Sequence, residues 1–125
     1  MTKILLVEDN EMNRDMLTRR LVRHGFEVCC APDGPSGVRM SEEEQPAVIL
    51  MDVALGDMDG WEATILIKRR ASTANIPVIA LTAHALASDR MKSVEVGCAD
   101  FDTKPVDLPR LLSKINACLQ GNTAA

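Results

Sequence analysis

The sequence predicts a single α/β domain in which helices cover both faces of a five-stranded parallel sheet. Five short apolar runs alternate with longer segments of helical periodicity along the 125 residues. The apolar runs are continuous, which is typical of strands that are covered on both faces. A repeated strand–helix pattern favours a doubly wound sheet with right-handed crossovers, and this length suits one compact domain.

The expected strands are Lys3–Val7, Glu27–Ala31, 47–52, 77–81 and the weaker Asp100–Thr103. Helices are expected over 12–24, over Gly34–Glu44, from Asp59 or Gly60 to Arg70, over 86–96, and after Asp107, with glycines at three of their ends. In the first helix, Met16, Leu17 and Leu21 fall on one expected inner face. We expect residues 1–121 to form the domain and 122–125 to form a short tail.

Composition excludes several classes of protein. The formal net charge of −4 argues against a nucleic-acid-binding surface, which is normally basic. No apolar run approaches the length of a membrane span, and the start of the chain does not resemble a signal peptide. The four cysteines match no zinc motif, so we expect small buried thiols in a reducing compartment. The expected location is the cytoplasm, with no nucleic-acid or membrane partner.

Polar residues that could bind ligands or take part in a reaction stand at the ends of the expected strands. Glu8 and Asp9 follow the first strand, Asp52 ends the third, Thr82 follows the fourth and Lys104 follows the fifth. In doubly wound folds ligands bind at the carboxyl ends of the strands, so we expect these side chains to converge. Three carboxylates repel one another unless a cation compensates them, and Mg²⁺ prefers such oxygen ligands.

With a cation present, Asp52 is a candidate nucleophile toward phosphorus. The oxygens of a transferred phosphoryl group need positive charge and hydrogen-bond donors around them. Lys104 offers the charge and Thr82 offers a hydroxyl. We therefore interpret Asp52, at the end of a buried strand, as a reactive residue and not as a structural one.

The sequence resembles the receiver domains of two-component response regulators. The matching stretches are "VEDN", "ILMD", "MDG", "ALTA", "GCADF" and "TKP", in that order between about Lys3 and Leu119. Each stretch alone is weakly specific, but the ordered set is highly specific. The resemblance implies a flavodoxin-like (βα)5 fold with strand order 2-1-3-4-5.

The resemblance also implies a role for each site residue. Asp52 would accept a phosphoryl group from a sensor histidine kinase or a histidine phosphotransfer protein. Mg²⁺ would bind Asp9 directly, together with Asp52 and the backbone carbonyl of Ala54. Glu8 would act on the ion largely through water. Lys104 would pair with Asp52 or with its phosphate.

The resemblance further implies a conformational switch. Thr82 would turn toward the phosphoryl group, and Phe101 would follow by changing rotamer. The Lys104–Pro105 peptide bond would be cis. The partner-binding face would comprise helix 86–96, strand Asp100–Thr103 and the last helix, where a downstream target protein would bind. The chain is expected to end after that helix, so its output would be protein–protein contact.

The sequence also bears on three other functions. A D-x-D phosphohydrolase needs a second acid where Ala54 stands, so that idea fails. A flavin-binding electron carrier is disfavoured because Glu8 and Asp9 would repel the flavin phosphate and the chain has no tyrosine for stacking. A phosphorylation-independent scaffold of the same fold remains the alternative. The expected protein is not an enzyme beyond catalysing its own phosphorylation and dephosphorylation.

Overall fold

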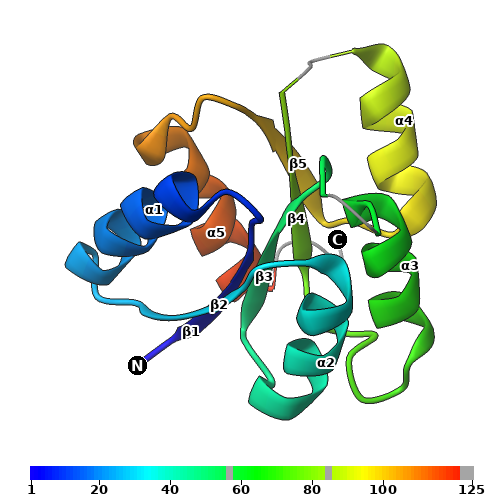
Figure 1. The fold of residues 1–125 in the computed structure, drawn as a ribbon, viewed down its shortest axis with the longest axis horizontal. Coiled ribbons are helices and arrows are strands. Elements are labelled where there is room, and N and C mark those ends of the chain that lie inside the picture. Colours follow the sequence, from blue (N-terminus) through cyan, green and yellow to red (C-terminus); the bar gives the residue numbers. More distant parts are fainter. Residues whose placement is uncertain (56–57, 84–85, 122–125) are drawn as a thin grey trace.

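The computed structural model describes residues 1–55, 58–83 and 86–121 and contains one five-stranded parallel sheet (Figure 1). Its strands are β1 (Lys3–Val7), β2 (Glu27–Ala31), β3 (Val48–Asp52), β4 (Val78–Thr82) and β5 (Asp100–Thr103). Their order across the sheet is β2-β1-β3-β4-β5. The predicted doubly wound α/β fold and its strand order are therefore confirmed.

Helices cover both faces of this sheet. They are α1 (Glu11–Arg23), α2 (Gly34–Glu44), α3 (Gly60–Arg69), α4 (Ala87–Val96) and α5 (Leu108–Leu119). In Figure 1, α1 and α5 lie on one side of the sheet, and α2, α3 and α4 lie on the other. The predicted helices differ from these bounds by one residue or less at each end, which is within the ordinary uncertainty of helix ends.

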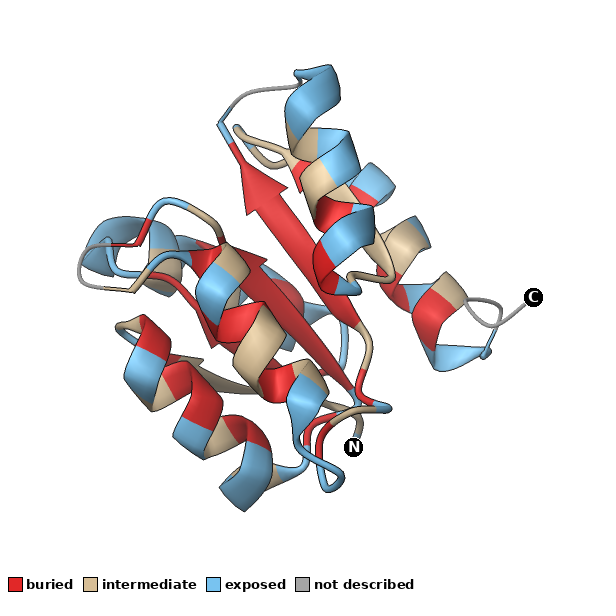
Figure 2. Ribbon diagram, turned by 90° about the vertical axis from the view of Figure 1, so that its right-hand side faces the viewer, coloured by how far each residue is buried: buried red, intermediate tan, exposed pale blue. Residues whose placement is uncertain are grey.

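Two apolar clusters fill the space between the sheet and its helix layers. One joins the sheet to α1 and α5 through residues such as Leu21 and Ile115, and the other joins it to α2 and α3 through residues such as Val38 and Ile67. The central strands are buried and the outer faces of the helices are exposed (Figure 2). The sheet thus presents its strand ends, and not its faces, to ligands.

The edge strand β2 departs from the prediction of full coverage. Only Ala31 of its five residues is buried, because β2 pairs with β1 alone. For the same reason Cys29 and Cys30 are only half-buried, as is Cys98 elsewhere, so the expectation of buried thiols is wrong for all but Cys118.

The domain division stays an expectation. The predicted tail, 122–125, lies outside the described residues. Within the ranges that the structure describes, no helix has the length and apolar character that a membrane span requires.

The N-cap of α1 directly follows the acid pair. The Asn10 side chain accepts a hydrogen bond from Asn13 N at 2.9 Å and satisfies one free amide of the first turn. We expect Asn10→Ala to lower the free energy of unfolding by about 1 kcal/mol, measured by urea denaturation. Asn10→Ser, which keeps the cap, is the control. Equal losses in both variants would contradict the capping role.

Candidate functional site

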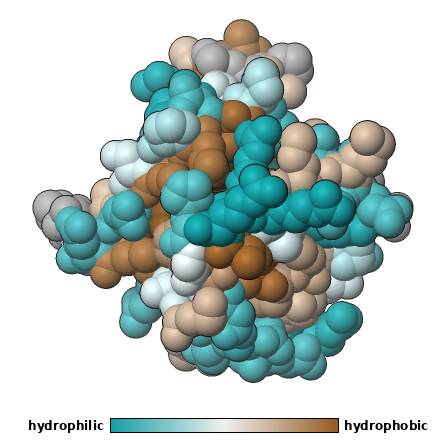
Figure 3. Space-filling model, turned by 90° about the vertical axis from the view of Figure 1, so that its left-hand side faces the viewer, coloured by the Kyte–Doolittle hydropathy of each residue, from teal (hydrophilic) through white to brown (hydrophobic). Residues whose placement is uncertain are grey.

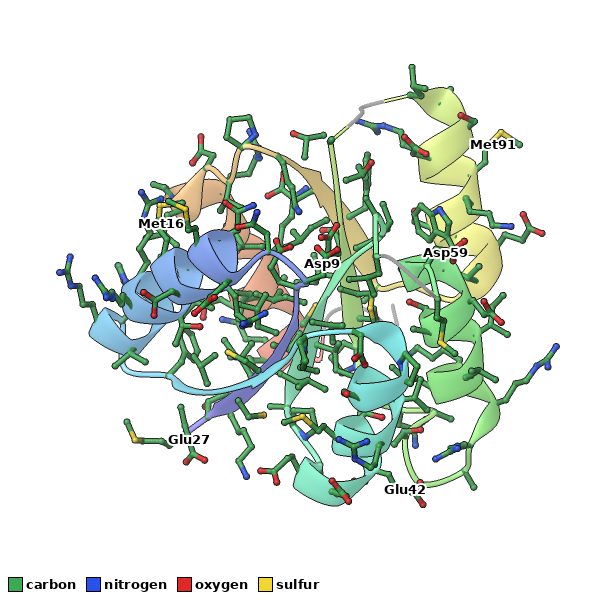
Figure 4. The ribbon with its side chains drawn as sticks, in the orientation of Figure 1. Asp9, Met16, Glu27, Glu42, Asp59 and Met91 are labelled. Atoms are coloured by element: carbon green, nitrogen blue, oxygen red, sulfur yellow. The ribbon has the colours of Figure 1, made fainter. Side chains whose placement is uncertain are left out.

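Three carboxylates meet at the carboxyl ends of β1 and β3. Oxygens of Glu8, Asp9 and Asp52 lie within 4.8 Å of one another. Glu8 and Asp52 are 4% and 2% exposed, whereas Asp9 is exposed. Figure 4 shows Asp9 at the same end of the sheet as Asp59, and Glu27 at the opposite end. The sequence-predicted acids are thus brought together.

The β1 end determines how the acid pair is oriented. Glu8 N donates to Ala31 O at 3.0 Å, so pairing with β2 continues one residue past β1. The Glu8 carboxylate accepts from Asn10 N at 3.2 Å, and Arg14 Nη1 donates to Glu8 O at 2.9 Å. Glu8 is consequently held in the interior, while Asp9 faces solvent.

Asp52 ends the fully buried strand β3. Its Oδ1 accepts a hydrogen bond from Ala54 N at 3.0 Å. The start of α3 passes very close to this strand end, since a Cβ placed on Gly60 would lie 2.3 Å from Asp52 O and 2.6 Å from Val53 Cα. The glycine of the "MDG" stretch is therefore required by this close approach.

Lys104 compensates the two buried acids. Its Nζ lies 3.0 Å from Glu8 Oε1 and 3.1 Å from Asp52 Oδ2. Its backbone N–H donates to Thr82 O at 2.7 Å, and the Lys104–Pro105 bond is cis, as the resemblance implied. The predicted contact of Lys104 with Asp52 is present, and the contact with Glu8 is an addition.

Electrostatics at this cluster follow from burial and charge. Burial raises the pKa of Glu8, the adjacent Asp52 raises it further, and the bond from Lys104 offsets part of the rise. Burial alone would lower the pKa of Lys104, but its bonds to Glu8 and Asp52 outweigh burial and raise it. The cluster therefore favours the charged form of Lys104 and disfavours the ionised form of Glu8.

The two predicted switch residues lie on neighbouring strands. Thr82 is 2% exposed and is the last residue of β4, whereas the sequence predicted that the strand would end at residue 81, just before it. Phe101 is half-buried on β5. Arg90 of α4 lies over its ring at 5.0 Å, and Lys114 of α5 lies 5.7 Å from the ring centroid. The switch roles of both residues and the ligand role of the Ala54 carbonyl stay predictions.

Some residues around the site were not anticipated from the sequence. Arg14 holds the Glu8 backbone, and Arg110 binds Asp102 next to the Lys104 segment. Asp102 and Arg110 are eight residues apart and belong to different elements, so no helical or strand periodicity links them. Only a defined β5–α5 geometry reveals their contact.

A cavity of about 490 Å³ lies between α1 and residues 104–106. Glu8 and Lys104 line it together with Leu17 and Met16 of α1. Met16 is 50% exposed, so its predicted inward placement is wrong. The side of the molecule that carries α1 shows apolar patches beside hydrophilic side chains (Figure 3). The cavity gives access to the acid–lysine cluster from this side.

Comparisons with known proteins agree on one family. The family model for the response regulator receiver domain matches residues 4–116. Protein PilH of Pseudomonas aeruginosa is 38% identical over 97% of this chain and 100% of its own length. The polar-differentiation response regulator DivK of Brucella ovis is 33% identical over 95% of this chain and 98% of its own length. The chain also matches 25% of the length of the Caulobacter vibrioides response regulator PleD.

Solved structures give the same result. The Vibrio cholerae chemotaxis protein CheY4 superposes with a TM-score of 0.90 at 26% identity, covering 95% of this chain and 99% of that one. The receiver domain of the Pseudomonas aeruginosa sensor histidine kinase PA1611 has a TM-score of 0.88 at 34% identity, over 95% and 98% of the two chains. That structure has a magnesium ion coordinated in its active-site cleft.

Proposed function

The chain belongs to the response regulator receiver domain family of two-component signalling, and from this premise we propose that Asp52 accepts a phosphoryl group from a phosphohistidine donor. One observation carries the proposal: two buried acids, one exposed acid and one lysine meet at the carboxyl edge of the sheet. Perturbed charged groups gathered in this way are typical of reactive sites.

The proposed step is a displacement at phosphorus. An oxygen of the Asp52 carboxylate forms a bond to phosphorus while the bond between phosphorus and the donor imidazole nitrogen breaks, and the nitrogen keeps the electron pair. The Ala54 N–H, 3.0 Å from Asp52 Oδ1, orients the carboxylate before reaction. Lys104, 3.1 Å from Oδ2, would balance charge on the phosphoryl oxygens, and Thr82 would offer its hydroxyl to one of them.

Receiver domains bind Mg²⁺ at an acidic cluster, and the acids of this chain fit such an ion. Glu8, Asp9 and Asp52 supply hard oxygen donors within 4.8 Å of one another, and Asp9 is open to solvent. We propose that Asp9, Asp52 and the Ala54 carbonyl hold it, with Glu8 acting through water. When bound, Mg²⁺ would neutralise negative charge on the phosphoryl group and on the acids.

Phosphorylation would act as a switch between two populations of one fold. We propose that Thr82 and Phe101 transmit the change to the face built by α4, β5 and α5. Arg90 of α4 and Lys114 of α5 already contact the Phe101 ring from that face. A downstream protein would bind there, and a sensor histidine kinase or a histidine phosphotransfer protein would supply the phosphoryl group. The role is signalling, with no catalysis beyond the protein's own phosphorylation and dephosphorylation.

The test is phosphorylation in solution. The protein is incubated with acetyl phosphate and Mg²⁺, and intact mass is recorded for wild type and for Asp52→Asn. We expect one phosphoryl adduct on wild type, none on Asp52→Asn, and none on wild type when Mg²⁺ is chelated. An adduct on Asp52→Asn would mean that another residue is the acceptor. A folded wild type without adduct would favour the phosphorylation-independent scaffold.

A further inference from the structure

We infer that Asp102 and Arg110 are positioning residues for Lys104, holding the end of β5 so that the lysine reaches the buried acids. The inference deepens the proposed function and rests on it only where phosphorylation is measured. It starts from a buried charge that the proposed chemistry does not use.

Asp102 is an unfavourable residue for its surroundings. It is 4% exposed, and it pairs in register with Leu81, a member of the apolar cluster beneath α1 and α5. Its Oδ2 has no hydrogen-bond partner among the described residues. A buried carboxylate oxygen without a partner disfavours folding, and an apolar side chain would avoid this cost. A residue that is costly for stability at such a place points to another role.

The other oxygen of Asp102 organises the end of β5. Arg110 Nε donates to Asp102 Oδ1 at 2.7 Å, and Thr103 N donates to the same atom at 2.8 Å. Arg110 Nη2 donates to Thr103 Oγ1 at 3.3 Å, while its Nη1 lies 3.9 Å from Asp107 Oδ2. One guanidinium thus contacts residues on both sides of segment 104–106.

Lys104 directly follows Thr103, the last residue of β5. On one side, its N–H is bound to Thr82 O of β4 at 2.7 Å. On the other side, the contacts of Arg110 fix Thr103 and the cap of α5. These two anchors limit where the lysine side chain begins, and the long side chain then spans to Glu8 and Asp52. Without the Arg110 anchor, the segment would keep its β4 hydrogen bond and the packing of Val106 against the apolar cluster, but it would lose the contacts that fix Thr103 and Asp107 to each other.

A second basic residue of α5 reinforces the same strand. Lys114 Nζ donates to Phe101 O at 2.6 Å and lies 3.8 Å from both Asp100 Oδ1 and Asp102 Oδ1. The hydrogen bond of Lys114 is to Phe101, before Asp102, and its contact with Asp102 is the longer one at 3.8 Å. Arg110 instead binds Asp102 at 2.7 Å and holds the part of β5 that leads to Lys104. This division singles out Asp102 and Arg110 as the pair that positions the lysine.

The decisive variant is Asp102→Leu, which removes the contact without leaving a buried charge. Three quantities are measured: the melting temperature, the rate of phosphorylation by acetyl phosphate with Mg²⁺, and the rate of Lys104 acetylation by an N-hydroxysuccinimide ester in Mg²⁺-free buffer, read by peptide mass spectrometry. Asp102→Asn keeps the oxygen that accepts from Arg110 and Thr103. Glu43→Leu, which removes an exposed ion pair with Arg39 on α2, is the matched control.

We expect Asp102→Leu to melt at or above the wild-type temperature while Lys104 is acetylated severalfold faster. Phosphorylation should slow by at least about tenfold, since small misplacements of a group near the reacting atoms are costly to rate. Asp102→Asn should fall between Asp102→Leu and wild type, and Glu43→Leu should match wild type.

Wild-type acetylation of Lys104 in Asp102→Leu would overturn the inference. If Asp102→Leu fails to fold, Arg110→Met, which removes the half-exposed guanidinium and with it the contact, decides by the same labelling. An unchanged Lys104 rate in Arg110→Met also overturns the inference. If wild type takes no phosphoryl group, the proposed function fails, while the labelling comparison still tests the positioning of Lys104.

Discussion

Replacing Lys104 by methionine is expected to lower the free energy of unfolding by about 3 kcal/mol at pH 7 in Mg²⁺-free buffer. The change removes the ammonium group that lies within 3.1 Å of two acids whose side chains are 6% and 3% exposed. Breaking a buried ion pair by removing one partner leaves uncompensated buried charge, which is far more costly than removing both. Urea denaturation of both proteins measures the difference.

The stability that Lys104→Met loses should depend on pH. The bond from Lys104 lowers the pKa of Glu8, whereas burial raises it above the ordinary value of 4.5. Removing Lys104 should therefore raise the pKa of Glu8 further. A carboxyl whose folded-state pKa is raised favours folding in its protonated form, and this contribution is lost as pH rises through the folded-state value. The deficit of Lys104→Met should therefore be small below pH 4.5 and grow above it.

A double variant provides the control. Asp52→Asn combined with Lys104→Met removes one of the two acids together with the lysine, so it should recover much of the stability that Lys104→Met loses. Mg²⁺ at millimolar concentration should narrow the deficit of the single variant, because without the lysine charge the acids attract the cation more strongly and Mg²⁺ then stabilises the variant more than wild type. A Lys104→Met protein as stable as wild type at pH 7 would show that the acids do not need this lysine.

Gly60→Ala is expected to destabilise the protein by about 3 kcal/mol or more, through overpacking against backbone. The new Cβ would lie 2.3 Å from Asp52 O and 2.6 Å from Val53 Cα, and neither atom can turn aside as a side chain can. Relief requires that α3 and the end of β3 separate, which displaces Asp52. We expect a lower melting temperature in thermal unfolding and slower phosphorylation of Asp52 by acetyl phosphate.

Gly37→Ala is the matched substitution. Its Cβ would meet Val7 Cγ2 at 2.8 Å and Cγ1 at 3.1 Å, which are methyl carbons of a buried side chain and not backbone atoms, so the misfit is smaller than at Gly60. We expect a smaller loss of stability and no loss of phosphorylation beyond that caused by unfolding. If Gly60→Ala were as stable as Gly37→Ala, the close approach at Asp52 would not be a constraint on α3.

Much of the fold was predictable because its strands are continuous apolar runs. The runs around Ile4, Ile49 and Ile79 form the three central strands, which have helices on both faces. Periodicity could not provide the strand order, because any order of five parallel strands buries the same runs. The order followed from the resemblance alone. The bounds of the edge strands β2 and β5 match the prediction, but the expected coverage of both faces does not hold for them, since both strands are only partly buried.

The site, like the fold, was predictable from the sequence only in part. Glu8, Asp9, Asp52 and Lys104 were predictable because the carboxyl ends of parallel strands share one edge. The pairing of Lys104 with Glu8 was not predictable, because it depends on the reach and direction of a long side chain. The contact of Arg110 with Asp102 was hidden for a related reason: strand and helix patterns describe single elements, whereas this contact joins two.

The pairing of Lys104 with Glu8 joins residues that are 96 positions apart, and this separation has a consequence for the folding pathway. Bringing distant residues together costs loop-closure entropy, and long-range contacts of this kind are associated with slow folding. A partly folded state that contains β1, β3 and β4 without β5 would already hold Glu8 and Asp52 close together with no lysine between them. Mutual repulsion of these acids would disfavour that intermediate, so docking of β5 completes the charge balance and the folding transition together.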